Sequence, residues 1–504
     1  MKTKDFRRSF SWAALLLAGV LTAASSLAVE RSPDGTGQVL LFPYYTARNN
    51  LITVFTIVNR EDWKAVKVRF REKKLGKVVA DLNVYMTPQD KWSVAIVPTA
   101  DGTALEVTDG TCTVPIVAPS LGGSGYLPFS NAKYIGDTAQ DDSLDRTREG
   151  YIEVIEMGQL GYFYLTETMT IDMAVWQSGT DSGRADNCPA VKAAWDTGVL
   201  PGTNSVAANT GGLMGSAHLI NLALGSDINY EPVALDHWND GVTPGRGALH
   251  TAPGSDLPSL DQVSPMTSNI LVSGGTKANN ARSLGPIVTS NWNNGLDAVS
   301  AVLMAGHIDN EYITDPTLLA GTDWVVTFPT KHLYTARSSP VPFEPVKASG
   351  AYCDSIALGS YGDFSPYDYG MDTQYSVPSV SLYLCGEVNV IPFGTGPTSN
   401  VLSSRPYNPQ GGTTTIPDSY LHPSGWASGS NYYTYGAFPD GSIPDQLLDA
   451  TGNIPPTLSG TGWLYHGLPM IGFAAIQFQA SNGAALASYG AATAHRPNQL
   501  LDTH

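Results

Sequence analysis

The sequence predicts a mainly β protein of antiparallel sandwich modules with an immunoglobulin-like arrangement, long loops rich in Gly, Pro and Tyr, and few short helices. Two observations predict this fold class. The 504 residues include 51 Gly, 34 Pro and 24 Tyr, and only 14% of them are charged, which is typical of a turn-rich β protein. Near the start of the chain, runs of Val, Ile, Phe and Tyr recur at about ten-residue spacing and end in turn residues, which indicates successive short strands.

Residues 1–28 have the three parts of a secretory signal peptide. Basic residues come first, an apolar run over 12–21 follows, and the small residues Ser26 and Ala28 predict cleavage before Val29. The apolar run is too short to span a membrane. The pair Arg7-Arg8 also resembles a twin-arginine export signal, so the sequence leaves the export route open.

Five predicted strands open the mature chain, at residues 38–45, 51–58, 65–72, 78–85 and 91–97. In the third strand, apolar and basic residues alternate, with Val66, Val68 and Phe70 set against Lys67, Arg69 and Arg71. A strand with this period places successive side chains on opposite faces. We therefore expect one face of the third strand to be buried and the basic face to lie in water.

Later elements are more widely spaced. The sequence predicts strands at 151–157, 161–168, 170–175, 324–329, 379–390 and 471–479, a short helix at 190–195, and either a strand or a short helix at 213–224. We expect a signal peptide over 1–28, an N-terminal β-sandwich domain over 29–177, a loop-rich middle region over 178–320 and a C-terminal β-rich region over 321–504.

Four cysteines are consistent with an oxidising compartment. They are Cys112, Cys188, Cys353 and Cys385, which are too far apart for a zinc knuckle or a CxxC redox pair. Three pairings are open, and we favour Cys112–Cys188 with Cys353–Cys385, because each pair closes a local loop.

The net charge excludes some partners. Loss of residues 1–28 removes four basic residues and Asp5, which takes the net charge from −17 to −20. A strongly acidic chain is a poor partner for nucleic acid and for an anionic membrane surface. No apolar run after residue 28 reaches the length of a membrane-spanning helix, so we expect none in the mature chain.

Three segments resemble parts of uncharacterised secreted or cell-surface proteins of Gram-negative bacteria: 37–45 (GQVLLFPYY), 322–331 (TDWVVTFPTK) and 467–473 (GLPMIGF). The resemblance implies an exported envelope protein. It transfers no activity and no functional residue.

Catalytic and metal-binding motifs give little support for an enzyme. The chain has no G-x-S-x-G, H-E-x-x-H, Walker A or C-x-x-C-H motif, and its nine histidines are scattered. Glu153 and Glu156 fall on one predicted strand but face opposite ways, so they cannot flank one glycosidic bond. We expect each to lie at an edge or rim of the fold, and we predict no catalytic residue.

Two weaker clusters suggest ligands. The acidic stretch Asp137, Asp141, Asp142, Asp145 can supply oxygens to Ca²⁺, although its spacing is not that of an EF-hand; a solvated loop is the alternative. The aromatic residues Tyr367, Tyr369, Trp426, Tyr432 and Tyr433 can stack on sugar rings; the alternative is that they pack loops onto the body. No other cofactor is expected.

Export, acidity and the β-rich composition together favour a non-enzymatic cell-surface or extracellular protein. Its role would be in a surface layer, in adhesion or in extracellular assembly, through self-association or contact with an extracellular glycan. A secreted carbohydrate-binding or carbohydrate-active protein is the first alternative, and a metal- or redox-associated envelope protein is the second. Residence in the periplasm also stays open.

Overall fold

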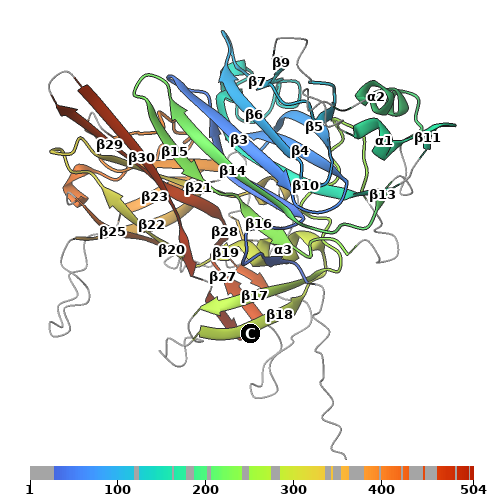
Figure 1. The fold of residues 1–504 in the computed structure, drawn as a ribbon. Helices are drawn as coiled ribbons and strands as arrows, with labels where there is room; N and C mark the ends of the chain where they lie inside the picture. Colours follow the sequence, from blue (N-terminus) through green and yellow to red (C-terminus); the bar gives the residue numbers. More distant parts are fainter. Residues whose placement is uncertain are drawn as a thin grey trace, which may run out of the picture.

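The structure is a computed structural model that describes residues 28–117, 124–161, 164–176, 185, 187–200, 206–240, 249–273, 284–334, 342–343, 353–362, 380–396, 399–421, 424–430, 446–448, 463–482, 485–498 and 500–503. Residues 1–27, which hold nearly all of the expected signal peptide, lie outside the described residues. The fold is mainly β, as the sequence predicts, and the pairs between its strands are antiparallel. Figure 1 shows the strands grouped into several stacked sheets.

The large sheet has the strand order β1-β16-β2-β10-β4-β5-β8, and β13 also pairs with β10. Its strands are β1 (Glu30–Arg31), β2 (Val39–Thr46), β4 (Lys64–Glu72), β5 (Val78–Met86), β8 (Cys112–Val114), β10 (Glu149–Leu160), β13 (Val206–Ala207) and β16 (Val233–Asp236). The structure therefore confirms the strands predicted at 38–45, 65–72, 78–85 and 151–157, with small differences at their ends.

A six-stranded sheet packs against the large sheet and completes a sandwich, with the order β15-β14-β3-β6-β7-β9. Its strands are β3 (Leu51–Asn59), β6 (Lys91–Pro98), β7 (Thr103–Val107), β9 (Gly125–Pro128), β14 (Leu213–Asn221) and β15 (Ser226–Tyr230). Phe55 is central to the core between the sheets, because its ring contacts Phe42, Phe70 and Trp92 edge-on at centroid distances of 5.6, 5.6 and 5.7 Å. Each such aromatic pair adds roughly 0.5–1.5 kcal/mol beyond the area it buries.

The immunoglobulin-like topology is not confirmed. Strand β10 lies between β2 and β4, and β14 pairs with β3 along its whole length. Strands from far along the chain are thus inserted among the first five, whereas an immunoglobulin domain completes its sheets within about 100 residues. The division into three regions stays a prediction that limited proteolysis can test.

The C-terminal part adds two further sheets, with the orders β24-β21-β29-β30 and β23-β22-β25-β20-β31. Their strands are β20 (His307–Ile313), β21 (Gly321–Thr327), β22 (Asp354–Gly362), β23 (Val380–Leu384), β24 (Val388–Pro392), β25 (Ser424–Ser430), β29 (Ile471–Asn482), β30 (Ala485–Ala494) and β31 (Arg496–Asn498). Figure 1 shows the long β29–β30 hairpin running alongside β15. There Phe473 stacks on Tyr230 at 4.5 Å, and a Cβ on Gly490 would lie 2.4 Å from the carbonyl oxygen of Asp227. Glycine permits this close approach of the two strands.

The sequence predicts one strand over 379–390, but the structure has two. Strands β23 and β24 are separated by Cys385, Gly386 and Glu387. A Cβ on Gly386 would lie 2.7 Å from the carbonyl oxygen of Lys73, so the turn between the strands is pressed against the end of β4. This contact lies more than 300 residues away in sequence and leaves no local signal.

Three α-helices lie among the described residues: α1 (Ile171–Val175), α2 (Cys188–Asp196) and α3 (Gly295–Leu303). The helix predicted at 190–195 is confirmed as α2. The strand predicted at 170–175 is wrong, because Ile171, Ala174 and Val175 are buried at helical spacing in α1. No helix is predicted at the position of α3, which is buried along almost its whole length.

Smaller elements complete the described fold. They are β11 (Tyr164–Thr166), β12 (Met169–Thr170), β17 (Thr267–Ser273), β18 (Leu284–Asn291), β19 (Met304–Ala305), β26 (Gln446–Leu448), β27 (Trp463–His466), β28 (Leu468–Pro469) and β32 (Leu500–Thr503), with 3-10 turns at Leu144–Arg148, Lys331–Tyr334 and Asp418–Tyr420. In the part of the chain that the structure describes, no helix combines the length and the apolar character that crossing a bilayer requires.

Candidate functional site

The basic face of β4 is buried, which contradicts the expectation that it lies in water. Lys67 and Arg69 are both 0% exposed, and Arg71 is 7% exposed. Residues 249–260, called the covering segment below, lie over this face of the large sheet. The covering segment lies almost 200 residues after β4 in sequence. Because it packs on the basic face, β4 is buried on both sides although its sequence pattern is amphipathic.

The covering segment is held by hydrogen bonds to outward-facing side chains of β4 and β5. Most of these side chains donate to main-chain carbonyls: Lys67 Nζ to Ala252 at 2.8 Å, Asn83 Nδ2 to Thr251 at 2.8 Å, and Arg69 Nη2 and Nη1 to Ser255 and Pro258 at 2.9 and 3.1 Å. Asp81 instead accepts from the amide of Gly254 at 2.7 Å. Buried charges are stable only when such partners replace water, so the basic face and the covering segment depend on each other.

A row of alternating charges crosses the large sheet beneath the covering segment. The strand register places Glu153 opposite Arg69, and Arg69 opposite Asp81. Arg69 Nη1 lies 3.3 Å from Glu153 Oε2, and its Nε lies 3.2 Å from Asp81 Oδ2. Arg71 Nε adds a second contact to Glu153 at 2.8 Å. Directly opposite charges stabilise neighbouring strands, and here the paired side chains are almost fully buried.

The expectation that Glu153 and Glu156 lie at a rim is wrong. They are 1% and 0% exposed, and β10 is an internal strand. Glu156 pairs with Lys64 at 3.0 Å and accepts hydrogen bonds from main-chain amides of the segment before β14. Each glutamate therefore has its own set of partners, and the two do not act as a pair.

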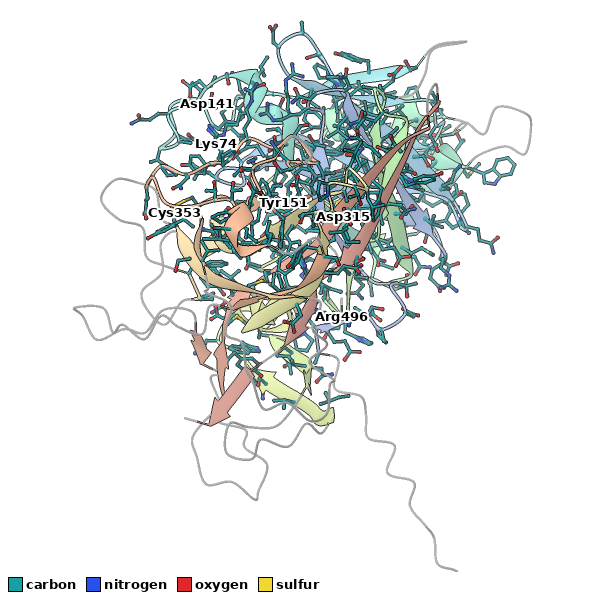
Figure 2. The ribbon with its side chains drawn as sticks, turned by 90° about the vertical axis from the view of Figure 1, so that its left-hand side faces the viewer. Lys74, Asp141, Tyr151, Asp315, Cys353 and Arg496 are labelled. Carbon is teal, nitrogen blue, oxygen red and sulfur yellow. A yellow bond between two sulfur atoms is a disulfide. The ribbon has the colours of Figure 1, made fainter. Side chains whose placement is uncertain are left out.

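A polar cluster continues from Glu153 towards the C-terminal sheets. We call Tyr151, Glu153, His332 and Glu387 the junction cluster, because they come from β10, from the 3-10 turn Lys331–Tyr334 and from the turn before β24. The Tyr151 hydroxyl lies 3.3 Å from Glu153 Oε1 and 3.4 Å from His332 Nδ1, and that nitrogen lies 3.4 Å from Glu387 Oε2. Figure 2 shows Tyr151 in the interior of the molecule.

Burial shifts the protonation of the junction cluster towards neutral forms. Desolvation raises the pKa of Glu387 well above its usual range, and Lys331 and Arg71 only partly oppose this shift. Desolvation lowers the pKa of His332, with further lowering by Arg71, and raises the pKa of Tyr151. His332 and Tyr151 are therefore neutral at pH 7, and burial favours the protonated form of Glu387.

Such perturbed groups are found at catalytic sites and also in structural networks. The junction cluster has the features of a structural network. Three of its four side chains are at most 2% exposed, and His332 has a side-chain exposure of 12%. Glu153 is occupied by two guanidinium groups, and the Tyr151 hydroxyl also lies within 3.4 Å of the Pro329 carbonyl. These contacts tie β10 to the turns that carry His332 and Glu387.

Asp323 on β21 is a second perturbed carboxylate. It is 0% exposed, and its Oδ2 accepts a hydrogen bond from the Leu402 amide at 2.8 Å. Burial raises its pKa to about 7, although the backbone amides of residues 400–402 act in the opposite direction. Its Oδ1 has no hydrogen-bond partner among the described residues. This carboxylate joins the segment around Leu402 to the four-stranded sheet.

The acidic stretch predicted to bind calcium is largely engaged in ion pairs. Asp137 pairs with Arg146 at 2.6 Å, Asp141 with Lys74 at 2.6 Å, and Asp145 with Arg48 at 3.1 Å; Asp142 accepts from the Gly136 amide at 2.8 Å. Figure 2 shows Lys74 and Asp141 side by side near the surface. Among the described residues, no three potential metal ligands converge on one point. The calcium hypothesis stays a prediction.

The aromatic residues predicted to bind a glycan are only partly placed. Tyr367, Tyr369, Tyr432 and Tyr433 lie outside the described residues. Trp426 is on β25, in register with Tyr361 of β22 on one side and Glu311 of β20 on the other. The glycan hypothesis therefore also stays a prediction.

The structure contains the disulfides Cys112–Cys188 and Cys353–Cys385, which are the pairs that the sequence favours. The first ties the edge strand β8 to α2. The second closes the loop between the start of β22 and the end of β23, next to Glu387 of the junction cluster. Both indicate an oxidising compartment.

Comparisons with protein-family models, characterised proteins and solved structures found no match. What the chain does must therefore be inferred from its own residues. The three segments that carry the sequence resemblance do lie together in space: β21 pairs with β29, and Thr327 of β21 donates to the carbonyl of Pro43 in β2 at 2.6 Å.

Sequence reasoning missed the junction cluster and Asp323. His332 and Glu387 are isolated in sequence, and neither falls within a known motif. The one available signal was the density of basic residues on β4 and of glutamates on β10. Charges at that density on neighbouring strands require partners, but the sequence does not say which strands are neighbours.

Proposed function

We propose that this chain is an exported, non-enzymatic protein of the cell surface or the extracellular space, which serves in a surface layer, in adhesion or in extracellular assembly. One observation carries the proposal. The buried basic side chains of β4 are occupied by carboxylates and by main-chain carbonyls, as Arg69 is by Glu153, Asp81 and the covering segment. Such groups hold a rigid framework together and do not face a substrate.

Composition and covalent structure agree with a scaffold outside the cytoplasm. Two disulfides join Cys112 to Cys188 and Cys353 to Cys385, and disulfides persist in oxidising compartments. Without residues 1–28 the net charge is −20, and a charge of this size favours solubility. Long loops on a rigid β framework are a common arrangement for recognition surfaces.

Fractionation of expressing cells tests the location. We expect protein that begins at Val29 and carries both disulfides in the periplasm, in the outer-membrane fraction or in the medium. Reduced protein with an intact N-terminus, recovered from the cytoplasm, would overturn the proposal. Size-exclusion chromatography then tests assembly, because a scaffold that self-associates elutes far above the mass of one mature chain, which is less than the 53.5 kDa of all 504 residues.

Substitutions in the junction cluster test whether the chain is an enzyme. Glu387→Gln and Tyr151→Phe keep the shape of each side chain and remove its acid–base chemistry. We expect both variants to be localised and assembled like the parent. Reducing-sugar release from a polysaccharide that is lost in both variants, but kept in Lys192→Gln at an exposed helix position, would instead identify a carbohydrate-active enzyme.

A further inference from the structure

The two residues that flank the predicted cleavage bond are built into the fold. Ala28 and Val29 are both 0% exposed. The Val29 amide donates to the Thr267 carbonyl at 2.9 Å, and the Val29 carbonyl accepts from the Asn269 amide at 2.9 Å. Val29 thus forms a parallel bridge with Ser268 of β17. A protease must take several residues around the bond it cuts into its own cleft, so it cannot act on a bond held in this way.

The residues that follow are anchored as firmly. Strand β1 pairs with β16, and the Ser32 amide donates to the Ala234 carbonyl at 3.0 Å. The Arg31 guanidinium donates to the carbonyls of Val302 and Met470 at 3.1 and 3.2 Å. The segment is therefore held on one side by the large sheet, and on the other by α3 and by Met470 directly before β29.

All of these partners lie late in the chain. They fall between residues 233 and 470, so the segment at 28–32 can dock only when most of the polypeptide is available to fold. Until then, the bond before Val29 is exposed. Once the fold is complete, the bond is buried.

We infer that the Ala28–Val29 bond is cut while the chain is unfolded, and that the chain crosses the membrane unfolded and folds afterwards. This inference rests on the proposed export of the chain. Hydrolysis consumes one water: the C–N bond breaks, the oxygen goes to the Ala28 carbonyl carbon, and the Val29 nitrogen becomes an ammonium. That ammonium keeps an N–H for the Thr267 carbonyl, so the cut product can form the same contact.

Burial of the Ala28–Val29 bond in the fold distinguishes the two export routes that the sequence leaves open. A twin-arginine route carries proteins that have already folded, and its cleavage site must then stay accessible in the folded state. Here folding removes the site from the surface. The pair Arg7-Arg8 therefore contributes positive charge to a general secretory signal and does not direct folded export.

Cleavage of a purified precursor tests this directly. The full chain is prepared unfolded and reduced, and half of it is refolded with its disulfides. Both halves are treated with purified signal peptidase, and the products are identified by mass. We expect cleavage before Val29 in the unfolded chain, and cleavage at least about ten-fold slower in the refolded chain, because the rate follows the population of opened molecules. Equal rates would overturn the inference.

A variant that loosens the docked segment provides a second readout. Arg31→Ala removes the bonds to Val302 and Met470, and it should speed cleavage of the refolded precursor without changing that of the unfolded one. Lys91→Ala, at an exposed position of β6, is the matched control and should change neither rate. Two results together would show that the burial of Val29 does not cause the slow cleavage. The refolded Arg31→Ala precursor would be as resistant to the peptidase as the refolded parent, and the refolded parent would be cut only at a bond upstream of Ala28.

Cells distinguish failure of this inference from failure of the proposed function. The double substitution Arg7→Lys and Arg8→Lys keeps the charge and removes the arginine pair. We expect unchanged yields of cut, exported protein. If the parent is exported but the variant stays in the cytoplasm, the inference of unfolded export is wrong and the proposed function still stands. If both proteins stay in the cytoplasm uncut, the proposed function is wrong, and the inference with it.

Discussion

Asp323 makes the stability of this protein depend on pH in an unusual direction. Its pKa is about 7 in the fold, against an ordinary value of 3.8 for an aspartate in water. A carboxylate whose folded pKa is raised binds a proton more tightly in the folded state, so its contribution to stability grows as the pH falls from about 7 towards 3.8. Since each pKa unit corresponds to about 1.4 kcal/mol, the full span is roughly 4 kcal/mol, of which about 3 kcal/mol falls between pH 8 and pH 5.

The substitution Asp323→Asn removes this titration with little change of shape. The amide oxygen can still accept from the Leu402 amide, and the NH2 group takes the place of Oδ1, which has no partner among the described residues. We expect the free energy of unfolding of the parent, relative to that of the variant, to increase by about 3 kcal/mol on going from pH 8 to pH 5.

Urea unfolding at several pH values, followed by tryptophan fluorescence, measures this difference. Other groups also titrate in this pH range. They are present in both proteins, so their contributions cancel in the difference between the two free energies of unfolding. Asp418→Asn is the control. The pKa of Asp418 is lowered by hydrogen bonds from Thr395, so that carboxylate stays ionised in both states from pH 5 to pH 8 and its removal should leave the profile parallel to that of the parent. Parallel profiles for Asp323→Asn as well would refute the reasoning.

Four further outcomes are expected. Arg69→Met should lower the free energy of unfolding in urea by about 3–5 kcal/mol, because it leaves buried carboxylates and carbonyls without a donor. Lys192→Met removes an exposed ion pair and should lower it by less than about 1 kcal/mol. Removal of the first disulfide by Cys188→Ser together with Cys112→Ser should lower stability by up to about 4.5 kcal/mol, from the chain entropy of its loop. Addition of EGTA should leave the melting temperature unchanged if the acidic stretch is held by its ion pairs, and a lower melting temperature would support calcium. Trp426→Ala should weaken binding on a glycan array if the aromatic patch is a sugar site, and undiminished binding would remove that hypothesis.

Local pattern was sufficient for much of the N-terminal sandwich. The runs of β-branched and aromatic residues that predict β2 to β6 need only the two-residue period of a strand and the turns between them, and both are written in consecutive residues. The helix α2 and the two disulfide pairs were predictable for the same reason, since each depends on nearby parts of the chain. Where local pattern was ambiguous, the prediction failed: the spacing of Ile171, Ala174 and Val175 fits a helix as well as a short strand.

The sequence by itself determined the fold class, the first strands and the oxidising setting that the cysteines imply. Only the tertiary structure decided what covers each face. Alternation along β4 says that its two faces differ, but it cannot say that the covering segment will bury the basic face. Nor can it say that β10 will bring Glu153 opposite Arg69, or that Val29 will be enclosed by residues more than 200 positions away. Burial and pairing are properties of elements brought together by folding, and no short stretch of the chain encodes them alone.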